Sequence, residues 1–447
     1  MKKNISYSIL ALSALMLIAS CKTKAPEIEG YKLMWHDEFD GKKLNSSYWN
    51  REVRPAGWTN HELQAYTEED ENIYVEDGKL VLRALQFPLK SGSFYYTSGK
   101  VQTSNKVHFT YGKVVARAKA PKGKGLWPAI WMMPSEDKFG NWPVSGEIDI
   151  MEVLGNETNK TYGTIHYGSP HAQKQGTYIT PEGTPDFSDD FHTYEVEWEP
   201  GIFRWYIDGN LFYVENNWFA KSRAGESFDY PAPFNEDFFI QLNLAVGGDW
   251  PGKPGPDTDF ENAKFEIDYV RVYQKEHYDT NVTKPTVTVP EPDENGNYIH
   301  NSFFAYDEPL NDGKDWTFLT ASAGEGKATI ANGSLKVETV NAGTVAHSIQ
   351  VVHPGINMKK GTKYRIQFDA KAEEARKIRV AITAPEVNWT RYFPDTETDI
   401  GTDWKTYTYE FTMNYDDDPF GRLEYNMGKL GSTSTVYFKN VTVTELK

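Results

Sequence analysis

Short segments in which polar and apolar residues alternate run through most of this chain. Alternation with a period of two turns one face of a β-strand toward a core and the other toward solvent. Between residues 31 and 274 these segments include KLVLRAL, KVVARAKA, EIDIMEV, TYEVEWEP, FRWYIDG, FFIQLNLAV and FEIDYVRVYQ. Turn signals such as EDGKL, IDGNL and PKGKG separate them, and no amphipathic helical pattern interrupts the series. The sequence therefore predicts an all-β fold.

A second strand-rich block follows a linker. Residues 275–297 contain Pro285, Pro290 and Pro292 and few apolar side chains, a composition typical of a semi-extended linker. Alternation returns between residues 298 and 447 in KYRIQFDAKA, KIRVAIT, KTYTYEFTM and TVYFKNVTVTEL. A block of roughly 150 residues is the size of one β-sandwich. We expect a larger β domain at 31–274 and a smaller β-sandwich at 298–447.

The first residues have the pattern of a secretory signal. Lys2 and Lys3 precede an apolar run that is too short to span a membrane, and small residues then lead to Cys21, the only cysteine. The residues IASC also resemble a bacterial lipobox, which implies a lipoprotein signal peptide at 1–20, a lipidated Cys21 and a tether at 21–30. A lipid anchor in the bacterial cell envelope, most simply the outer membrane, would follow. The alternative is an ordinary signal peptide that ends near a cysteine.

Composition limits the partners of the chain. A net charge of -16 disfavours nucleic acids and anionic polymers, because these need a basic surface. Aromatic residues make up 14% of the chain, more ring surface than a core of this size usually needs. Exposed rings stack on sugar faces, although strands also favour aromatic residues for their own packing.

One apolar segment, WPVSGEIDIMEVLG, carries three acidic residues. In a regular strand Glu147 and Asp149 share a face, whereas Glu152, five positions after Glu147, points to the other side. A β-bulge near Ile150 and Met151 would turn Glu152 back to the first face, with the isoleucines of the segment packed beneath. The sequence therefore predicts a bulged strand with its acids gathered on one face. The alternative is an edge strand with a solvated acidic face.

Acids gathered in this way suit glycoside hydrolysis. One carboxylate attacks the anomeric carbon while a second carboxyl group gives a proton to the leaving oxygen. Carboxyl groups about 5–5.5 Å apart act with retention of configuration, and a wider separation gives inversion. The sequence alone leaves both spacings open.

The surroundings of these acids resemble the laminarinase branch of glycoside hydrolase family 16. The resemblance covers nearly all of 31–274 and includes HDEFDG, NHELQAYT, YTSGKVQT, GKGLWPAIWMMP, GTIHYG and LNLAVGGDWPG. It implies a concanavalin-like β-jelly roll, whose two curved sheets form an open glycan cleft, and hydrolysis of internal β-glycosidic bonds with retention. By position Glu147 would be the nucleophile and Glu152 the general acid/base. Asp149 would hydrogen-bond the nucleophile, unless it only satisfies nearby backbone.

The same resemblance implies a set of substrate-binding side chains. These are Asn60, Trp127, Trp131, His166 and Trp250. We expect the tryptophans at 131 and 250 to stack on sugar rings, and prefer Asn60 to Glu62 as a partner for a sugar hydroxyl. The histidine contacts sugar, assists the acid/base or is structural. Many relatives have Asn at the position of His61 and Arg at that of Lys100, so the contacts at the glycone end differ here.

Two further tryptophans have a different environment. Trp198 and Trp205 alternate with apolar residues within strands, and we expect both in the core.

The resemblance also implies a structural calcium ion on the convex face. Its ligands would be Glu38, the carbonyl of Gly78 and Asp268. Mixed carboxylate and carbonyl oxygens suit calcium. Catalysis itself needs no cofactor, and no His or Cys cluster suggests zinc.

The C-terminal block resembles carbohydrate-binding modules of the family 4/9 type. The resemblance rests on its strand pattern and makes Trp389, Tyr392 and Phe393 in NWTRYFP the candidates for glycan-facing rings. Trp404 opens a strand, and we expect it in the core. The alternative is a sandwich that only spaces the first domain from the membrane.

These features together predict a monomeric retaining endo-β-1,3-glucanase that acts on laminarin-type β-glucans and is held at a membrane by its lipid anchor. A mixed-linkage β-1,3-1,4-glucanase is the alternative within the same class. A surface lipoprotein that captures glycan without cutting it is the alternative outside it, but both glutamates are present. Agarases and carrageenases share the fold, yet charged substrates fit poorly with this acidic chain.

Overall fold

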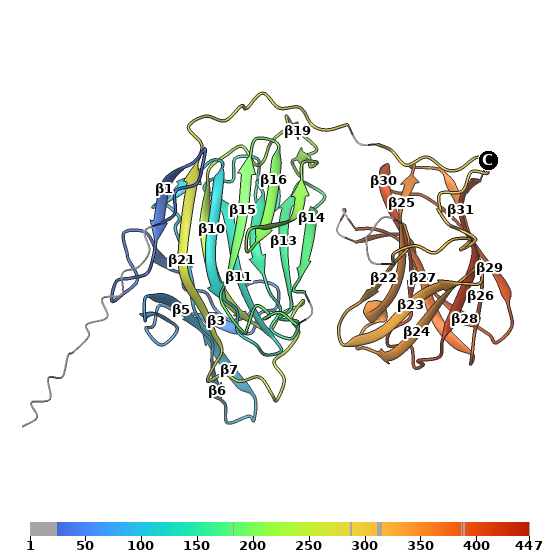
Figure 1. Ribbon diagram of the computed structural model, residues 1–447, viewed down its shortest axis with the longest axis horizontal. Coiled ribbons are helices and arrows are strands. Elements are labelled where there is room, and N and C mark those ends of the chain that lie inside the picture. Colours follow the sequence, from blue (N-terminus) through green and yellow to red (C-terminus); the bar gives the residue numbers. More distant parts are fainter. Residues whose placement is uncertain are drawn as a thin grey trace, which may run out of the picture.

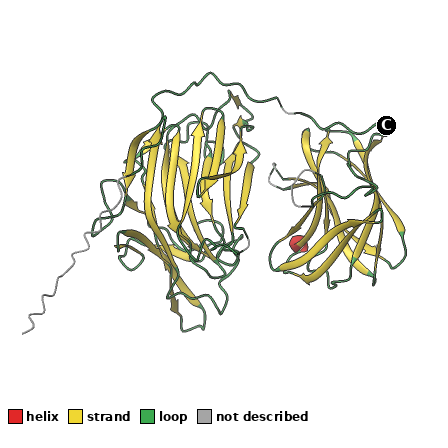
Figure 2. Ribbon diagram, in the orientation of Figure 1, coloured by secondary structure: helices red, strands yellow, loops and turns green. Residues whose placement is uncertain are grey.

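In the computed structural model, residues 25–181, 183–286, 288–310, 315–385, 387 and 389–446 are described. They form two β-rich bodies that the segment 275–297 connects (Figure 1). Strands dominate both bodies (Figure 2), and the described residues contain a single short 3-10 helix, η1 (Ala346–Ser348). The all-β expectation is confirmed.

Two large sheets make up the first body. The first sheet has the order β17-β16-β15-β10-β21-β5-β4, and β1 also pairs with β21. Its strands are β1 (Lys32–Asp37), β4 (Ile73–Glu76), β5 (Lys79–Arg83), β10 (Gly112–Lys119), β15 (His192–Glu199), β16 (Ile202–Ile207), β17 (Asn210–Glu215) and β21 (Lys264–Gln274). All its pairings are antiparallel, as expected for a jelly roll.

The second sheet has the order β14-β13-β12-β11-β20-β8-β2, and β9 pairs with β20. Its strands are β2 (Asn50–Arg51), β8 (Lys100–Gln102), β9 (His108–Phe109), β11 (Leu126–Pro134), β12 (Glu147–Glu152), β13 (Lys160–Tyr167), β14 (Ala172–Ile179) and β20 (Phe238–Val246). Shorter strands at the periphery are β3 (Gln64–Tyr66), β6 (Leu85–Pro88), β7 (Phe94–Ser98), β18 (Ala220–Lys221) and β19 (Ser227–Phe228). The acidic segment thus lies in the middle of a sheet and not at its edge.

Aromatic rings fill the space between the two sheets. Trp198 and Trp205 are fully buried, as predicted, and both stack on Phe203 with ring centroids 6.3 and 5.4 Å apart. Gly163 of β13 faces the same core, and a Cβ atom at this glycine would lie 2.5 Å from the Trp205 ring. The Trp205 ring therefore fills the space that a side chain at position 163 would need.

Five-stranded sheets form both layers of the second body. One has the order β22-β25-β30-β27-β28 and the other β23-β24-β31-β26-β29. The strands are β22 (Thr317–Thr320), β23 (Gly324–Ala331), β24 (Ser334–Ala342), β25 (Ile349–Met358), β26 (Lys363–Ala372), β27 (Arg376–Ala384), β28 (Thr390–Ile400), β29 (Lys405–Thr412), β30 (Asp418–Asn426) and β31 (Val436–Leu446). A separate apolar core lies between them.

The prediction that Trp404 belongs to this core is wrong. Its side chain is 38% exposed, and the ammonium of Lys439 lies 4.3 Å from its ring centroid. Trp404 comes just before β29 begins, so the alternation of that strand does not fix its side. The ring covers lysine side chains on the outer surface.

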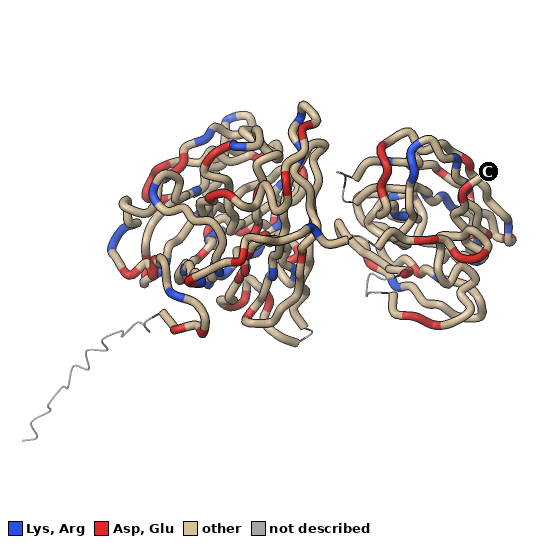
Figure 3. The backbone as a smooth tube through the Cα atoms, turned by 90° about the horizontal axis from the view of Figure 1, so that it is seen from above, with Lys and Arg blue, Asp and Glu red and all other residues tan. Residues whose placement is uncertain are grey.

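Charged residues occur throughout both bodies. Figure 3 shows Asp and Glu interspersed with Lys and Arg in each of them. In the described residues no helix has the length and hydropathy to cross a membrane. The predicted signal segment and Cys21 lie outside the described residues.

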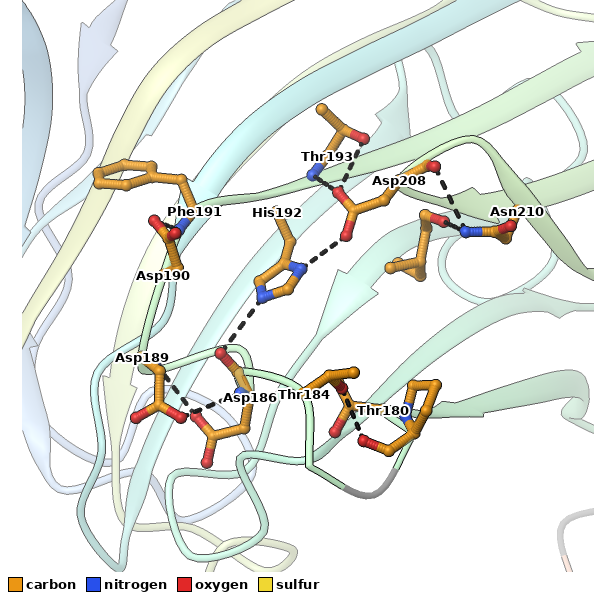
Figure 4. Close-up of polar contacts among 12 residues, drawn as sticks. Thr180, Thr184, Asp186, Asp189, Asp190, Phe191, His192, Thr193, Asp208 and Asn210 are labelled. Atoms are coloured by element: carbon orange, nitrogen blue, oxygen red, sulfur yellow. Dashed lines mark hydrogen bonds and ion pairs between the residues drawn. The ribbon is translucent and has the colours of Figure 1, made fainter.

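A partly buried histidine joins the start of β15 to the turn between β16 and β17 (Figure 4). His192 places Nδ1 2.7 Å from Asp208 Oδ2 and Nε2 3.2 Å from the carbonyl oxygen of Asp186, and the backbone N–H of Thr193 donates to Asp208 Oδ1. Both ring nitrogens thus face acceptors, which only the protonated imidazole can satisfy. The hydrogen bond to Asp208 raises the pKa of His192.

This contact makes stability depend on pH. A histidine whose pKa is raised by folding stabilises the protein fully below its unfolded pKa of about 6.5, and the effect is lost as pH rises through the folded pKa. We expect His192→Gln to lower the free energy of unfolding more at pH 5.5 than at pH 8.5, by about 1 kcal/mol or less because Asp208 is partly exposed. Urea denaturation at both pH values measures this. Equal losses at the two pH values would contradict it.

Candidate active site

A β-bulge in β12 organises the acidic segment. Against β11, Asp149 is opposite Trp131 and Met151 is opposite Ile130, so Ile150 has no partner. The pairing with β13 shifts over the same stretch, between Asp149 and Glu152. The predicted bulge is therefore present.

A hydrogen bond from a residue of the opposite sheet supports the bulge. The indole N–H of Trp205 donates to the carbonyl oxygen of Asp149 over 2.9 Å. Ile148 and Ile150 are buried, as expected. Because a bulge disrupts the regular ladder, a hydrogen bond from the core helps to fix the strand at this point.

The three acids of β12 influence one another. Burial and then the charge of Asp149 raise the pKa of Glu147 to about 8. Burial, followed by the charges of Asp149 and Glu147, raises the pKa of Glu152 well above its usual range. Burial also raises the pKa of Asp149. The strand can therefore keep one carboxyl group protonated at neutral pH while another is ionised.

Each acid has its own neighbour in the site. The indole N–H of Trp142 donates to Glu147 Oε2 over 2.5 Å, and that of Trp127 donates to Glu152 Oε1 over 3.1 Å. His166, opposite Glu147 in β13, places Nε2 3.3 Å from Asp149 Oδ2. Ligand atoms of Glu147, Asp149 and His166 all lie within 4.8 Å of one another.

Aromatic rings line the Glu152 end of the site. Trp250 lies 5.5 Å from Trp127 and 4.9 Å from Tyr162, measured between ring centroids, and is 40% exposed. Tyr162 is opposite Glu152 in β13. The structure thus brings the predicted Trp127 and Trp250 together beside the acid, with a tyrosine that the sequence did not single out.

Asn60 lies near the same loop as Trp250. Its carbonyl oxygen accepts a hydrogen bond from the backbone N–H of Asp249 over 2.9 Å, and its amide donates to Glu62 Oε1 over 3.2 Å. Asn60 is exposed and Glu62 is buried. The exposure agrees with the preference for Asn60 as a sugar contact, because the amide is open to solvent.

Lys100 of β8 and Trp131 of β11 lie on the same sheet as the acids. The indole N–H of Trp131 donates to Asn243 Oδ1 over 2.7 Å. The ammonium of Lys100 is buried and lies 4.8 Å from the Trp131 ring and 5.1 Å from that of Trp58. Burial lowers the pKa of Lys100, although Glu52 lies 3.6 Å away. The lysine at this position thus sits in an aromatic box.

The second body carries a separate polar surface. Leu423 and Tyr425 of β30 face its core, so alternation places Arg422 and Glu424 on the outer face of the sheet. Trp389 is 44% exposed, with the Arg422 guanidinium 4.7 Å from its ring centroid. An exposed ring beside a polar network is suited to a sugar.

A network of hydrogen bonds lies beneath this tryptophan. Glu424 is 1% exposed and accepts hydrogen bonds from Arg422, Thr383, Gln350 and Asn426. Burial acts to raise the pKa of Glu424, but Arg422 and these hydrogen bonds hold it below its usual value. The side chains around Trp389 are therefore fixed before any ligand binds.

Two of the predicted glycan-facing rings are buried. Tyr392 is 6% exposed and donates its hydroxyl to Asp418 Oδ2 over 2.9 Å, and Phe393 is 7% exposed and packs on Tyr409 and Phe411. Their prediction as binding rings is wrong, because the start of β28 turns both inward. Trp389, just before that strand, stays outside.

Comparisons with known proteins agree with this geometry. Residues 60–271 match the glycosyl hydrolases family 16, and residues 296–435 match a carbohydrate binding domain. The chain is 41% identical over 269 residues to the glucan endo-1,3-beta-glucosidase A1 of Niallia circulans, covering 56% of this chain but 39% of that longer protein. It is 37% identical over 285 residues to the beta-glucanase of Rhodothermus marinus, covering 61% of this chain and 96% of the relative.

This chain belongs to glycoside hydrolase family 16. An X-ray structure of the endo-beta-1,3-glucanase from Pyrococcus furiosus is also similar to it, with 40% identity, 56% of this chain and 97% of that chain covered, and a TM-score of 0.47.

Besides Tyr162, sequence reasoning missed Trp142 and His171 of this family 16 hydrolase. Trp142 opens the acidic segment itself, but nothing in its spacing showed that the loop before β12 returns its ring to Glu147. His171 lies in the turn between β13 and β14 and contacts His166. The available signal was the place of His171 in a hairpin turn directly after the strand that carries the predicted His166.

The expected calcium ligands come from three adjoining elements. β1 and β5 both pair with β21, and they bring Glu38 and Gly78 toward Asp268. Arg271 binds Glu38 through two hydrogen bonds of 2.8 Å, and Arg117 binds Asp268 over 3.0 Å. The oxygen donors suit calcium, but the arginines already balance both carboxylates. Calcium binding by this hydrolase stays a prediction.

We expect Glu147→Gln to lower hydrolysis by at least about 1,000-fold while the fold is kept, because an amide cannot replace a carboxylate nucleophile. Initial rates on β-glucan and circular dichroism measure the two effects. Azide added to Glu147→Ala should give a glycosyl azide of inverted configuration, since the azide attacks the substrate directly. Azide added to Glu152→Ala should give retained configuration. Near wild-type activity in Glu147→Gln would contradict the assignment.

Proposed function

We propose that this protein is a retaining endo-β-1,3-glucanase that cleaves internal bonds of laminarin-type β-glucans. One observation carries the proposal. The β-bulge at Ile150 gathers Glu147, Asp149 and Glu152 in one buried group whose pKa values are raised by burial and mutual charge. Relatives named glucan endo-1,3-beta-glucosidase and beta-glucanase support the choice of substrate.

The first half of the reaction uses the two glutamates in opposite protonation states. Ionised Glu147 attacks the anomeric carbon, and protonated Glu152 gives its proton to the leaving oxygen, so a glycosyl ester forms as the glycosidic bond breaks. Burial and Asp149 favour the protonated form of Glu147, and the Trp142 N–H acts against them by stabilising the ionised form that attacks. Burial keeps the proton on Glu152 at neutral pH.

In the second half Glu152, now ionised, takes a proton from water, and the hydroxide attacks the anomeric carbon and releases Glu147. The Trp127 N–H is placed to stabilise Glu152 in this ionised state. Two inversions at the anomeric carbon give net retention. The Trp127 and Trp250 rings beside Glu152 provide apolar faces on which sugar rings can stack.

Product analysis tests this function. The full chain is incubated with laminarin, lichenan, barley β-glucan and agarose, and products are sized and their anomeric configuration is followed by NMR from the first minutes. We expect a ladder of β-anomeric oligosaccharides from laminarin. Higher activity on lichenan and barley β-glucan would favour the mixed-linkage alternative. Absence of products from every β-glucan would overturn the proposal.

The C-terminal domain is proposed to hold long β-glucan chains through Trp389 and its polar network. We expect a chain ending at Thr283 to keep its turnover on short soluble oligosaccharides, because it retains Tyr278, which packs on Tyr111 of the first body. Retention on insoluble β-1,3-glucan should fall about tenfold or more in both the truncated chain and Trp389→Ala, since a second site raises local substrate concentration. The exposed Trp404→Ala is the control. Equal retention by all variants would leave the domain as a spacer.

A lipid anchor on Cys21 is proposed to hold the enzyme at the cell envelope. The lipobox-like IASC sequence supports it. We expect Cys21→Ala to move the protein from a detergent-requiring membrane fraction to a soluble one, because acylation needs that thiol. Fractionation of cells expressing each form measures this, with Glu147→Gln as a control that should stay at the membrane. Unchanged fractionation would argue for a plain secretory signal.

A further inference from the structure

A pair of histidines lies beside the acids of β12, on the neighbouring strand and the turn that follows it. His166 belongs to β13, and His171 lies in the turn that leads to β14. His166 Nδ1 and His171 Nε2 are 2.9 Å apart, and the two ring centroids are 5.1 Å apart. The Trp142 ring packs against His171 with centroids 4.9 Å apart. The pair is thus held between the strand and the loop that carries Trp142.

The other nitrogen of His166 faces a carboxylate. Asp149 Oδ2 is buried and has no hydrogen bond of good geometry to any described residue, and His166 Nε2 at 3.3 Å is positioned to become its donor. An ionised carboxylate can only accept a hydrogen bond. The arrangement therefore favours a proton on Nε2 of His166.

This choice fixes the role of His171. Burial lowers the pKa of both histidines, to about 4 for His171, so both rings are neutral near pH 7. A neutral imidazole carries one N–H, so a His166 that donates through Nε2 must accept through Nδ1. The atom that faces Nδ1 is Nε2 of His171, which must then be the donor.

We propose that His171 is a positioning residue: by donating to Nδ1 of His166 it holds that ring in the Nε2-protonated tautomer that donates to Asp149. The inference rests on the proposed function, because it assigns the pair a role in the same reaction.

The consequence for the reaction passes through Asp149. A donor at Oδ2 stabilises the ionised form of Asp149. The charge of ionised Asp149 is one of the causes that raise the pKa of Glu152, so it helps to keep the proton that the leaving oxygen needs. The same charge raises the pKa of Glu147, whose carboxylate the Trp142 N–H stabilises. His171 therefore influences which acids of the site are protonated without touching the substrate.

The titratable groups that face this pair are few among the described residues. Glu147 and Asp149 face His166 from β12, and Glu152 lies further along the same strand. On β14 the residue opposite His166 is Gln173, which does not titrate. A change in the pH profile caused by position 171 therefore has to act through His166 and the three acids.

Two isosteric variants test the proposal. The amide of His171→Gln can still donate to His166 Nδ1, whereas the carboxylate of His171→Glu can only accept and requires a proton on Nδ1. Nitrogen NMR of the full chain with ¹⁵N-labelled histidine reports which ring nitrogen is protonated, and His166→Gln identifies the signals. We expect Nε2 of His166 to be protonated in the wild type and in His171→Gln, and Nδ1 in His171→Glu.

Kinetics on laminarin supply the second readout. In His171→Gln we expect kcat and the pH profile of kcat/KM to stay close to wild type. In His171→Glu we expect kcat to fall about 10- to 100-fold with little change in KM and with shifted limbs of the pH profile, as for a histidine held in the wrong tautomer. Circular dichroism checks that each variant folds.

A proton on Nδ1 of His166 in the wild type would overturn the proposal, and so would identical behaviour of the two variants. The NMR measurement needs no substrate. A wild-type chain that leaves every β-glucan intact would therefore contradict the proposed function and leave the tautomer assignment to be judged separately.

Discussion

The hydrogen bond from the Trp205 indole to the carbonyl oxygen of Asp149 joins the buried core of the first body to the strand that carries the catalytic acids. Without the bulge at Ile150, strand periodicity would send Glu147 and Glu152 to opposite faces of the sheet. The bulge interrupts the regular ladder, and a residue of the opposite sheet provides a hydrogen bond at that place. The position of the acids thus depends on the packing of a tryptophan that substrate never reaches.

Gathering three carboxyl groups in a buried site is unfavourable for folding, and the neighbours of the acids show how the chain accommodates it. Each glutamate receives one indole N–H, from Trp142 or Trp127, while Asp149 shares a hydrogen bond with Glu147 and places Oδ2 at the longer distance from His166. Single neutral donors stabilise negative charge without removing it. A lysine or arginine in their place would lower the pKa of the acid and take away the proton that bond cleavage needs. Lys100, a buried cation on the same sheet, is instead enclosed by the rings of Trp58 and Trp131.

Much of the fold and of the site could be predicted from the sequence. The predictions that were wrong or missing concern residues near strand ends or in loops. Alternation placed Trp198 and Trp205 in the core, and the spacing of the acids required the bulge, because both arguments concern residues inside strands. Trp404, Tyr392 and Phe393 lie within a few residues of a strand end, where alternation no longer decides which side a ring takes. Trp142 and His171 lie in loops that fold back on the site, and only the tertiary structure brings them there. The family resemblance supplied the roles of the glutamates, which periodicity alone does not distinguish.

The close approach of Gly163 to Trp205 affects how this enzyme can vary. Gly163 lies on the inner face of β13 and has no part in the reaction, yet any larger residue there would displace the indole that supports the carbonyl of Asp149. Selection for activity would therefore keep this glycine as strictly as a glutamate of the site. In an evolving population, position 163 would look like a catalytic position although its only requirement is the absence of a side chain.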